Sequence, residues 1–283
     1  WDPEYGLNND LALLLSTSGT LGSSKLVRLS YENISSNAFS ISEYLSINEN
    51  ERPITVLPMH YSFGLSIINS HIVSGATILL TGYSLMDKRF WTFLKAKRAT
   101  SLSGVPYTFE ILKKLKFFNL DLPYLKTITQ AGGKLIEEIN REFSLFCQNN
   151  QKQFFVMYGQ TEASPRISYL PAEYALSKLG SIGVAIPGGQ LSLLDKNKNF
   201  IIEDEIVGEL VYKGPNVFMG YAVNSADLMK EDENNKILVT GDMAKRDSDG
   251  FYYIVGRKKR FVKLYGNRIN LDEVEQLLKT IIS

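Results

Sequence analysis

The stretch TSLSGVPYTFEILKKLKFFNLDLPYLKTITQA, Thr100–Ala131, decides the fold that this sequence predicts. It opens with TSLSG and closes with KTITQA, two short runs whose residue types and length are typical of β-strands. Between them, Pro106–Phe118 has the apolar spacing of an amphipathic helix. A strand, a helix and a second strand in this order indicate two parallel strands joined by a crossover helix.

The same alternation extends in both directions from this unit, from Leu11 to about Gly159. The other expected strands are LALLLST (11–17), ITVLP (54–58), ATILLT (76–81) and QFFVMYG (153–159). The other expected helices are Tyr31–Ser46, with Ser30 as its N-cap, Ser62–Ser74, Met86–Lys97 and Ile136–Gln148. We therefore expect a parallel sheet with helices on its faces, and a ligand site where its strands end.

Beyond about Gly180 the pattern changes to short strands that are broken by Gly, Asn and Asp. These strands are QLSLLD (190–195), GELVYK (208–213), KILVTG (236–241) and GFYYIVG (250–256). They are typical of an antiparallel sheet or a small barrel. The sequence thus predicts an α/β fold with an αβ subdomain at residues 1–180 and a small antiparallel, β-barrel-like subdomain at residues 181–256.

Composition narrows the classes of function. The chain has 283 residues, 44% of them hydrophobic, and a formal net charge of +1 at pH 7. That balance provides no basic surface for nucleic acid, and no apolar run approaches the ~20 residues of a membrane span. Two histidines and one cysteine argue against a zinc site and against a disulfide framework. We expect a cytoplasmic protein that binds no nucleic acid and does not span a membrane.

A loop rich in glycine and hydroxyl groups, STSGTLGSSK (Ser16–Lys25), follows the first expected strand. Such residues are ordinary in surface connections, and composition alone leaves that interpretation open. The alternative is a phosphate cradle, in which glycines admit the anion, hydroxyls and N–H groups donate to its oxygens, and lysine neutralises its charge. The spacing T-S-G-T-x-G-x-x-K differs from that of the P-loop of nucleotide hydrolases.

Two other segments favour the phosphate cradle. MYGQTEAS (Met157–Ser164) sets an aromatic ring, a hydroxyl and a carboxylate directly after a strand. These groups suit a purine, a phosphate oxygen and Mg²⁺. Asp242, after a Thr-Gly turn, and Arg257, on an adjacent turn, offer a carboxylate and a guanidinium that together can hold ribose hydroxyls.

With these segments together, the sequence resembles the adenylate-forming superfamily, which includes acyl-CoA synthetases, adenylation domains of non-ribosomal peptide synthetases and firefly luciferase. The family's phosphate loop, [ST]-S-G-[ST]-T-G-x-P-K-G, is matched from Thr17 to Lys25, and its Y-G-x-T-E by YGQTE (158–162). Its G-E-L-x-x-x-G, T-G-D and G-R-x-[DK]-x-x-I-K-x-x-G-x-R-I segments are matched within GELVYKGPNVFMGY (208–221) and by TGD (240–242) and GRKKRFVKLYGNRI (256–269). The loop departs from the pattern at Leu21, Ser24 and Leu26, where the family has a hydroxyl, proline and glycine.

The resemblance also implies that the chain is part of a larger enzyme. Family members carry a further αβ region before the phosphate loop and end in a small mobile domain with a lysine essential for adenylation. Residues 1–180 would then bind the nucleotide and the acyl group, and residues 257–283 would be the hinge and the truncated start of the mobile domain. This piece alone is expected to be inactive, with a naturally short protein as the alternative.

Site roles follow from the resemblance, residue by residue. Contacts to the β- and γ-phosphates are expected from Thr17, Ser18, Gly19, Thr20, Gly22 and Lys25. Thr161 is expected at the α-phosphate, Glu162 at Mg²⁺, Tyr158 and Gly159 at adenine, and Asp242 and Arg257 at ribose. The turn that borders adenine and the acyl pocket is Gly132-Gly133, the pocket residues are His60 and Tyr61, the hinge residue is Lys259, and Lys263 approaches the nucleotide. Catalysis is expected to depend on Thr161, Glu162 and Lys25.

Structural alternatives stay open for several of these residues. Tyr158 also fits a core tyrosine at a strand end, and His60 a structural histidine. The two glycines of QAGGKL (130–135) also fit an ordinary strand-to-helix turn. Lys259 and Lys263 also fit a solvated basic run.

The implied reaction is ATP-dependent activation of a carboxylic acid to acyl-AMP, with release of pyrophosphate and later transfer of the acyl group to a thiol. ATP and Mg²⁺ are the expected cofactors, with coenzyme A or a phosphopantetheine carrier protein as the acceptor. The segment LPMHYSFG (57–64) lacks the aspartate with which amino-acid-activating relatives pair an α-ammonium, which favours small acids without an amine. An amino-acid adenylation domain, a non-catalytic nucleotide-binding relative and a purely structural protein remain alternatives.

Overall fold

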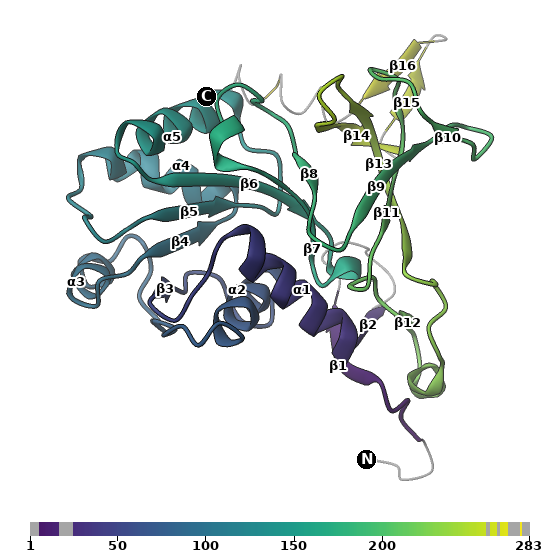
Figure 1. Ribbon diagram of the computed structural model, residues 1–283, viewed down its shortest axis with the longest axis horizontal. Helices are drawn as coiled ribbons and strands as arrows, with labels where there is room; N and C mark the ends of the chain where they lie inside the picture. Colours follow the sequence, from purple (N-terminus) through teal and green to yellow (C-terminus); the bar gives the residue numbers. More distant parts are fainter. Residues whose placement is uncertain (1–5, 17–24, 259–260, 265–266, 271–277, 279–283) are drawn as a thin grey trace.

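The computed structural model describes residues 6–16, 25–258, 261–264, 267–270 and 278 (Figure 1). Its central element is a 6-stranded sheet with the order β3-β4-β5-β6-β7-β8. These strands are β3 (Pro53–Ile54), β4 (Ser101–Gly104), β5 (Thr127–Gln130), β6 (Gln153–Gly159), β7 (Arg166–Leu170) and β8 (Val184–Ala185). The strands from β3 to β6 pair in parallel, as the sequence predicts, whereas β7 and β8 add antiparallel pairs at one side.

Helices cover both faces of this sheet (Figure 1). They are α1 (Tyr31–Tyr44), α2 (Ser62–Ile72), α3 (Lys88–Ala96), α4 (Pro106–Lys114) and α5 (Glu137–Asn149). Apolar residues of α3, α4 and α5 form one core cluster with alternate strand residues such as Leu102 and Ile128. On the opposite face, Phe63 and Ile67 of α2 pack against Phe155. This layering confirms the predicted α/β class.

Local capping explains where the helices begin. The Ser30 hydroxyl accepts a hydrogen bond from the Asn33 N–H at 3.0 Å, and the Asn33 side chain accepts one from the Ser30 N–H at 2.9 Å. This reciprocal capping box confirms the predicted N-cap of α1. Helix α3 begins at Lys88 rather than Met86, because the Asp87 carboxylate caps it by accepting from the Arg89 N–H at 2.8 Å.

Two strand predictions need correction. The sequence predicts that the strand before the phosphate loop belongs to the main parallel sheet. Instead, β1 (Leu11–Ser16) pairs antiparallel with β2 (Leu26–Ser30), and β2 pairs with β12 (Gly220–Ala222), in a separate sheet. Strands joined by a short loop pair antiparallel, since parallel pairing needs a longer crossover. The stretch at 76–81 contributes only a bridge between Leu79 and Ile54 within the described residues.

The later strands form an antiparallel sheet, one of the two predicted forms, and its strand order is β10-β9-β11-β13-β14. These strands are β9 (Gln190–Leu194), β10 (Phe200–Ile201), β11 (Gly208–Lys213), β13 (Ile237–Arg246) and β14 (Tyr252–Arg257). A hairpin of β15 (Phe261–Leu264) and β16 (Asn267–Asn270) follows. The short 3-10 helices are η1 (Phe117–Asn119), η2 (Thr161–Ala163), η3 (Ala172–Tyr174) and η4 (Ser225–Met229).

A second core cluster joins this sheet to β2 and β7. It contains Val27 of β2, Ile167 of β7, and Leu210 and Tyr212 of β11, all of them buried. The shared core fixes the position of β13 relative to the end of β6. The boundaries after residues 180 and 256 stay predictions, and most of the predicted start of the mobile domain, residues 271–277 and 279–283, lies outside the described residues. In the described part of the chain, no helix has the length and apolar character needed to cross a membrane.

Candidate active site

The end of β6 meets β13 through one buried carboxylate. Asp242 of β13 is only 4% exposed. Tyr158 of β6 donates its hydroxyl proton to Asp242 Oδ2 at 2.5 Å, and Gln160 Nε2 donates to the same oxygen at 3.1 Å. Burial and the neighbouring carboxylate raise the pKa of Tyr158 well above its usual value. The phenol therefore stays protonated and holds Asp242 in a fixed orientation.

Arg257 approaches the other oxygen of the same carboxylate. The register of β13 and β14 sets Arg257 opposite Asp242, and the Arg257 Nε atom lies 3.3 Å from Asp242 Oδ1. The Arg257 side chain is 68% exposed, so the pair lies at the border between core and solvent. The structure thus brings together the residues predicted to hold ribose and adenine. Their contacts with a nucleotide stay predictions.

The turn after β6 presents Thr161 and Glu162 at the carboxyl end of the parallel strands. This turn requires a glycine at position 159, because a Cβ atom there would lie 1.9 Å from the Pro165 carbonyl oxygen. The Thr161 hydroxyl lies 3.2 Å from the hydroxyl of Ser62, the first residue of α2. Helix α2 has no side-chain cap on its N-terminal N–H groups. Two hydroxyls beside uncapped helix N–H groups suit a phosphate oxygen.

Glu162 and Lys25 meet at a third residue, Tyr221 of β12. The Tyr221 hydroxyl donates to Glu162 Oε1 at 2.8 Å, and the Lys25 Nζ atom lies 5.6 Å from the centre of the Tyr221 ring. Burial and the Glu162 carboxylate raise the pKa of Tyr221, so the phenol remains a neutral donor. The separate sheet of β1, β2 and β12 therefore still delivers the end of the phosphate loop to the predicted phosphate site.

The carboxylate of Glu162 fits the predicted role at Mg²⁺. It is half-buried, and among the described residues its side-chain partner is the neutral Tyr221 phenol. Within the described ranges, no three His, Cys, Asp or Glu side chains are placed so that they could hold a metal ion together. Mg²⁺ commonly binds through one or two carboxylates together with substrate phosphates and water. A single carboxylate beside the predicted phosphate site would thus be a sufficient protein contribution.

The predicted acyl pocket begins at the turn after β5. Gly132 has φ +81, and a Cβ atom there would lie 2.7 Å from the Tyr61 hydroxyl. A Cβ atom at Gly133 would lie 3.1 Å from the Pro106 ring. Gly132 therefore allows Tyr61 to pack against this turn, and Gly133 allows the Pro106 ring to do so. Burial raises the pKa of the Tyr61 hydroxyl. His60, by contrast, is exposed in the turn before α2, and its predicted role in the pocket stays untested.

Some predicted residues lie outside what the structure describes. These are Thr17, Ser18, Gly19, Thr20, Gly22 and Lys259, together with the side chain of Lys263.

Sequence reasoning in turn missed three residues of the site, namely Gln160, Ser62 and Tyr221. Gln160 is the variable position of Y-G-x-T-E, and Tyr221 ends the GELVYKGPNVFMGY segment (208–221), so both were adjacent to recognised motifs. For Ser62, the signal in the sequence was its position as the first residue of the predicted helix Ser62–Ser74.

Sequence comparison identifies known CoA ligases that resemble this chain along most of its length. The chain is 29% identical over 276 residues to a 2-succinylbenzoate–CoA ligase of Bacillus cereus, covering 97% of this chain and 55% of that protein. It is also 29% identical over 269 residues to a mitochondrial medium-chain acyl-CoA ligase of Rattus norvegicus, covering 92% of this chain and 43% of that protein. The chain thus spans about half the length of the curated relatives it matches.

The fold itself is found in a solved relative. O-succinylbenzoate coenzyme A synthetase from Bacillus subtilis, in complex with ATP and magnesium ion, superposes with a TM-score of 0.82 at 26% identity, covering 97% of this chain and 55% of that one. A family model described as AMP-binding enzyme matches residues 2–222, a range that contains the phosphate loop, the Y-G-x-T-E turn and Tyr221. From these matches and the site geometry, the chain belongs to the family of AMP-binding enzymes.

Proposed function

We propose that the protein containing this chain uses ATP to activate a carboxylic acid as its acyl-AMP, and then transfers the acyl group to coenzyme A. The observation that supports this most is the convergence of four segments at the carboxyl end of β6. Asp242 and Arg257 meet Tyr158 there, beside Thr161 and Glu162. These groups correspond to ribose, adenine, α-phosphate and metal in the motifs of the family.

The chemistry needs no general base from the protein. A carboxylic acid with a pKa near ~4 is ionised at neutral pH, so its oxygen is already a nucleophile. That oxygen forms a bond to the α-phosphorus, the bond from this phosphorus to the bridging oxygen breaks, and pyrophosphate leaves. Thr161 and the N–H groups at the start of α2 would orient the α-phosphate, and Lys25 would neutralise the departing phosphates. Mg²⁺ on Glu162 would supply further positive charge there.

The second step consumes the acyl-AMP. A thiolate sulfur attacks the acyl carbon, and AMP departs with the oxygen that joined it to the acyl group. Both curated relatives above carry names of CoA ligases, which favours coenzyme A over a carrier protein as the acceptor. Their names give different acids, so the acid of this protein is not transferred from either one.

Pyrophosphate release tests the proposal. The intact protein is incubated with ATP, Mg²⁺ and a panel of carboxylic acids, with and without coenzyme A. We expect release that depends on the acid, and formation of an acyl-CoA thioester when coenzyme A is present. Tight ATP binding without release for any acid would instead favour the non-catalytic alternative, and absence of both would favour a structural protein.

A further inference from the structure

One short segment, residues 218–221, is bound to Glu162 at two points. The Phe218 N–H donates to the Glu162 carbonyl oxygen at 2.9 Å, and the Tyr221 hydroxyl donates to Glu162 Oε1 at 2.8 Å. The rings of Phe218 and Tyr221 also pack edge to face, with their centres 4.9 Å apart. The backbone and the side chain of Glu162 are therefore both held by a segment that lies far along the chain.

A buried ion pair fixes this segment against β2. Strand β12 pairs with β2, with Gly220 opposite Arg28. Arg28 is fully buried, and its guanidinium donates to the Met219 carbonyl oxygen at 3.3 Å and to the Glu233 carboxylate at 2.7 Å. A Cβ atom at Gly220 would lie 2.3 Å from Glu233 Oε2 and 2.7 Å from Arg28 Nη2, so the ion pair packs directly against this glycine. The backbone next to Tyr221 is thus held in place by the fold itself.

Tyr221 also lies beside the end of the predicted phosphate loop. Strand β2 begins directly after Lys25, and β12 lies next to β2 in Figure 1. Lys25 is exposed, with its Nζ atom 5.6 Å from the centre of the Tyr221 ring. A cation over an aromatic ring contributes little at an exposed site, whereas a hydrogen bond to a carboxylate is stronger and directional. The hydroxyl of Tyr221 is therefore the group whose contact can affect the site most.

The hydrogen bond from Tyr221 occupies only one oxygen of Glu162. Within the described residues, Glu162 Oε2 has neither a hydrogen bond nor an ion pair. The last side-chain torsion of glutamate has no sharp preference of its own, so a donor fixed on one oxygen determines the direction of the other. Mg²⁺ requires nearly ideal octahedral geometry, and the orientation of a ligating oxygen therefore matters for its binding.

We propose that Tyr221 is a positioning residue for magnesium, whose hydroxyl orients the Glu162 carboxylate so that its second oxygen is available to the metal of Mg·ATP. This inference rests on the proposed function, and it gives a role to a residue to which the family resemblance assigns none. Tyr221 acts only through Glu162 and takes no part in making or breaking bonds. The alternative is a direct contact between the Tyr221 hydroxyl and ATP.

The effect of Mg²⁺ on ATP affinity tests the proposal without turnover. The dissociation constant for ATP is measured by calorimetry on the intact protein, with no carboxylic acid present, once in EDTA and once in excess Mg²⁺. The ratio of the two values reports how much the metal strengthens binding. Tyr221→Phe removes only the hydroxyl and should reduce this ratio by about tenfold, as is common for hydrogen-bonded partners of metal ligands, while the value in EDTA stays the same.

Two results with Tyr221→Phe would overturn the inference. An unchanged ratio would mean that the hydroxyl does not affect the metal. Equal weakening of ATP binding in EDTA and in Mg²⁺ would mean that the hydroxyl contacts ATP itself. A ratio within one variant does not depend on how much of the protein is folded, so partial unfolding does not imitate either result.

A double variant tests whether Tyr221 acts through Glu162. Glu162→Gln should reduce the ratio at least as much as Tyr221→Phe does, and the two changes together should reduce it no further, because residues that act as one unit are not additive. Independent, additive reductions would contradict the inference and leave the proposed function in place. A wild-type ratio in Glu162→Gln would instead count against the magnesium site of the proposed function.

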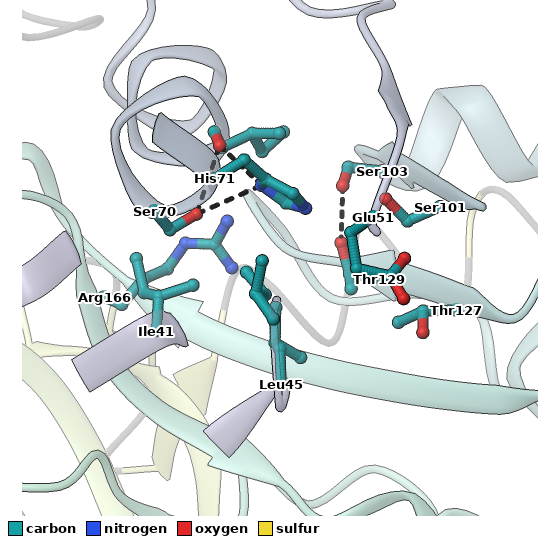
Figure 2. Close-up of a pocket in the computed structure, with 12 residues that line it drawn as sticks. Ile41, Leu45, Glu51, Ser70, His71, Ser101, Ser103, Thr127, Thr129 and Arg166 are labelled. Carbon is teal, nitrogen blue, oxygen red and sulfur yellow. Dashed lines mark hydrogen bonds between the residues drawn. The ribbon is translucent and has the colours of Figure 1, made fainter. Parts of the chain in front are cut away.

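Two control variants remove a hydroxyl elsewhere. Tyr253 donates to Asp247 Oδ2 at 3.2 Å, which is also a contact between a phenol and a carboxylate. Thr129 donates to Ser103 at 2.7 Å in the wall of a small cavity between α1, α2 and the main sheet (Figure 2). Tyr253→Phe and Thr129→Val should lower thermal stability and leave the ratio unchanged. A tenfold reduction of the ratio in either control would contradict the assignment to Tyr221, since lost stability alone would then change the effect of Mg²⁺.

Discussion

Tyr158 and Asp242 lie 84 residues apart in the sequence and are joined by a 2.5 Å hydrogen bond where the two large sheets meet. The bond fixes the carboxylate from one side while Arg257 approaches it from the other. A buried, pre-oriented carboxylate is a strong acceptor for hydroxyl groups, because little reorganisation is needed when the ligand arrives. The proposed ribose site is therefore assembled by tertiary structure rather than by one local motif.

Replacement of Asp242 should weaken nucleotide binding. Asp242→Asn removes the charge but keeps the shape, and hydrogen bonds to charged groups contribute about 1.5–3 kcal/mol. The dissociation constant for ATP, measured by calorimetry on the intact protein, should rise by about tenfold to a hundredfold. Asp204→Asn is the control, since Asp204 is an exposed partner of Arg246 at 2.7 Å. Equal ATP affinity of the two variants would show that Asp242 does not contact the nucleotide.

The carboxylate of Glu162 should matter more for turnover than for binding. Glu162→Gln keeps the hydrogen bond with Tyr221 possible but removes the negative charge proposed to hold Mg²⁺. Acid-dependent pyrophosphate release should drop at least about a hundredfold, or ~3 kcal/mol in the barrier. Glu203→Gln changes an exposed glutamate and should have no effect. If turnover of Glu162→Gln matches wild type at saturating Mg²⁺, the metal is held elsewhere.

The turn after β6 should not tolerate a side chain at position 159. A Cβ atom of Gly159→Ala would meet the Pro165 carbonyl oxygen at 1.9 Å, so the backbone must move. We expect a loss of about 2 kcal/mol or more in the free energy of unfolding, measured by urea denaturation. Gly82→Ala is the matched control, because a Cβ atom at Gly82 has nothing within 4 Å. Similar losses for both variants would mean that this turn is not closely packed.

Alkaline pH should destabilise the fold through Tyr44. Burial raises the pKa of Tyr44 to about 12, whereas an unfolded tyrosine titrates near ~10. Below pH 10 both states are protonated and the contribution of Tyr44 is fully present. Above pH 10 the unfolded state loses the proton first, so the free energy of unfolding falls until the folded pKa is reached.

The Tyr44→Phe variant isolates this contribution. Between pH 9 and pH 11, wild type should lose about 1 kcal/mol more of its unfolding free energy than the variant does. Urea midpoints at the two pH values give the comparison, and the difference between the proteins should be constant below pH 9. Parallel losses across the whole range would show that the Tyr44 hydroxyl is accessible to water.

Local patterns in the sequence were sufficient for the main layers of the fold. The amphipathic spacing of α2 and α5 and the Ser30 cap of α1 act within a few residues, so one segment contains the whole signal. The pairing of β2 with β12 is different, because strand periodicity does not identify a partner that lies far along the chain. The same limit explains why β1 was assigned to the wrong sheet.

The site residues also fall into two groups, those that the sequence alone identifies and those that depend on tertiary structure. Tyr158, Glu162 and Asp242 belong to motifs, and their residue types alone indicate the chemistry. Tyr221 joins Glu162 to Lys25 only because β12 adds to the small sheet, which no local pattern reveals.

The transfer of one oxygen atom tests acyl-AMP formation most directly. The intact protein is given ATP, Mg²⁺, coenzyme A and a carboxylic acid labelled with ¹⁸O in its carboxyl group, and the AMP is analysed by mass spectrometry. Because the acid oxygen bonds to the α-phosphorus and stays there when the thiol takes the acyl group, the AMP should carry one ¹⁸O atom. Unlabelled AMP, or formation of ADP and phosphate instead, would contradict the account.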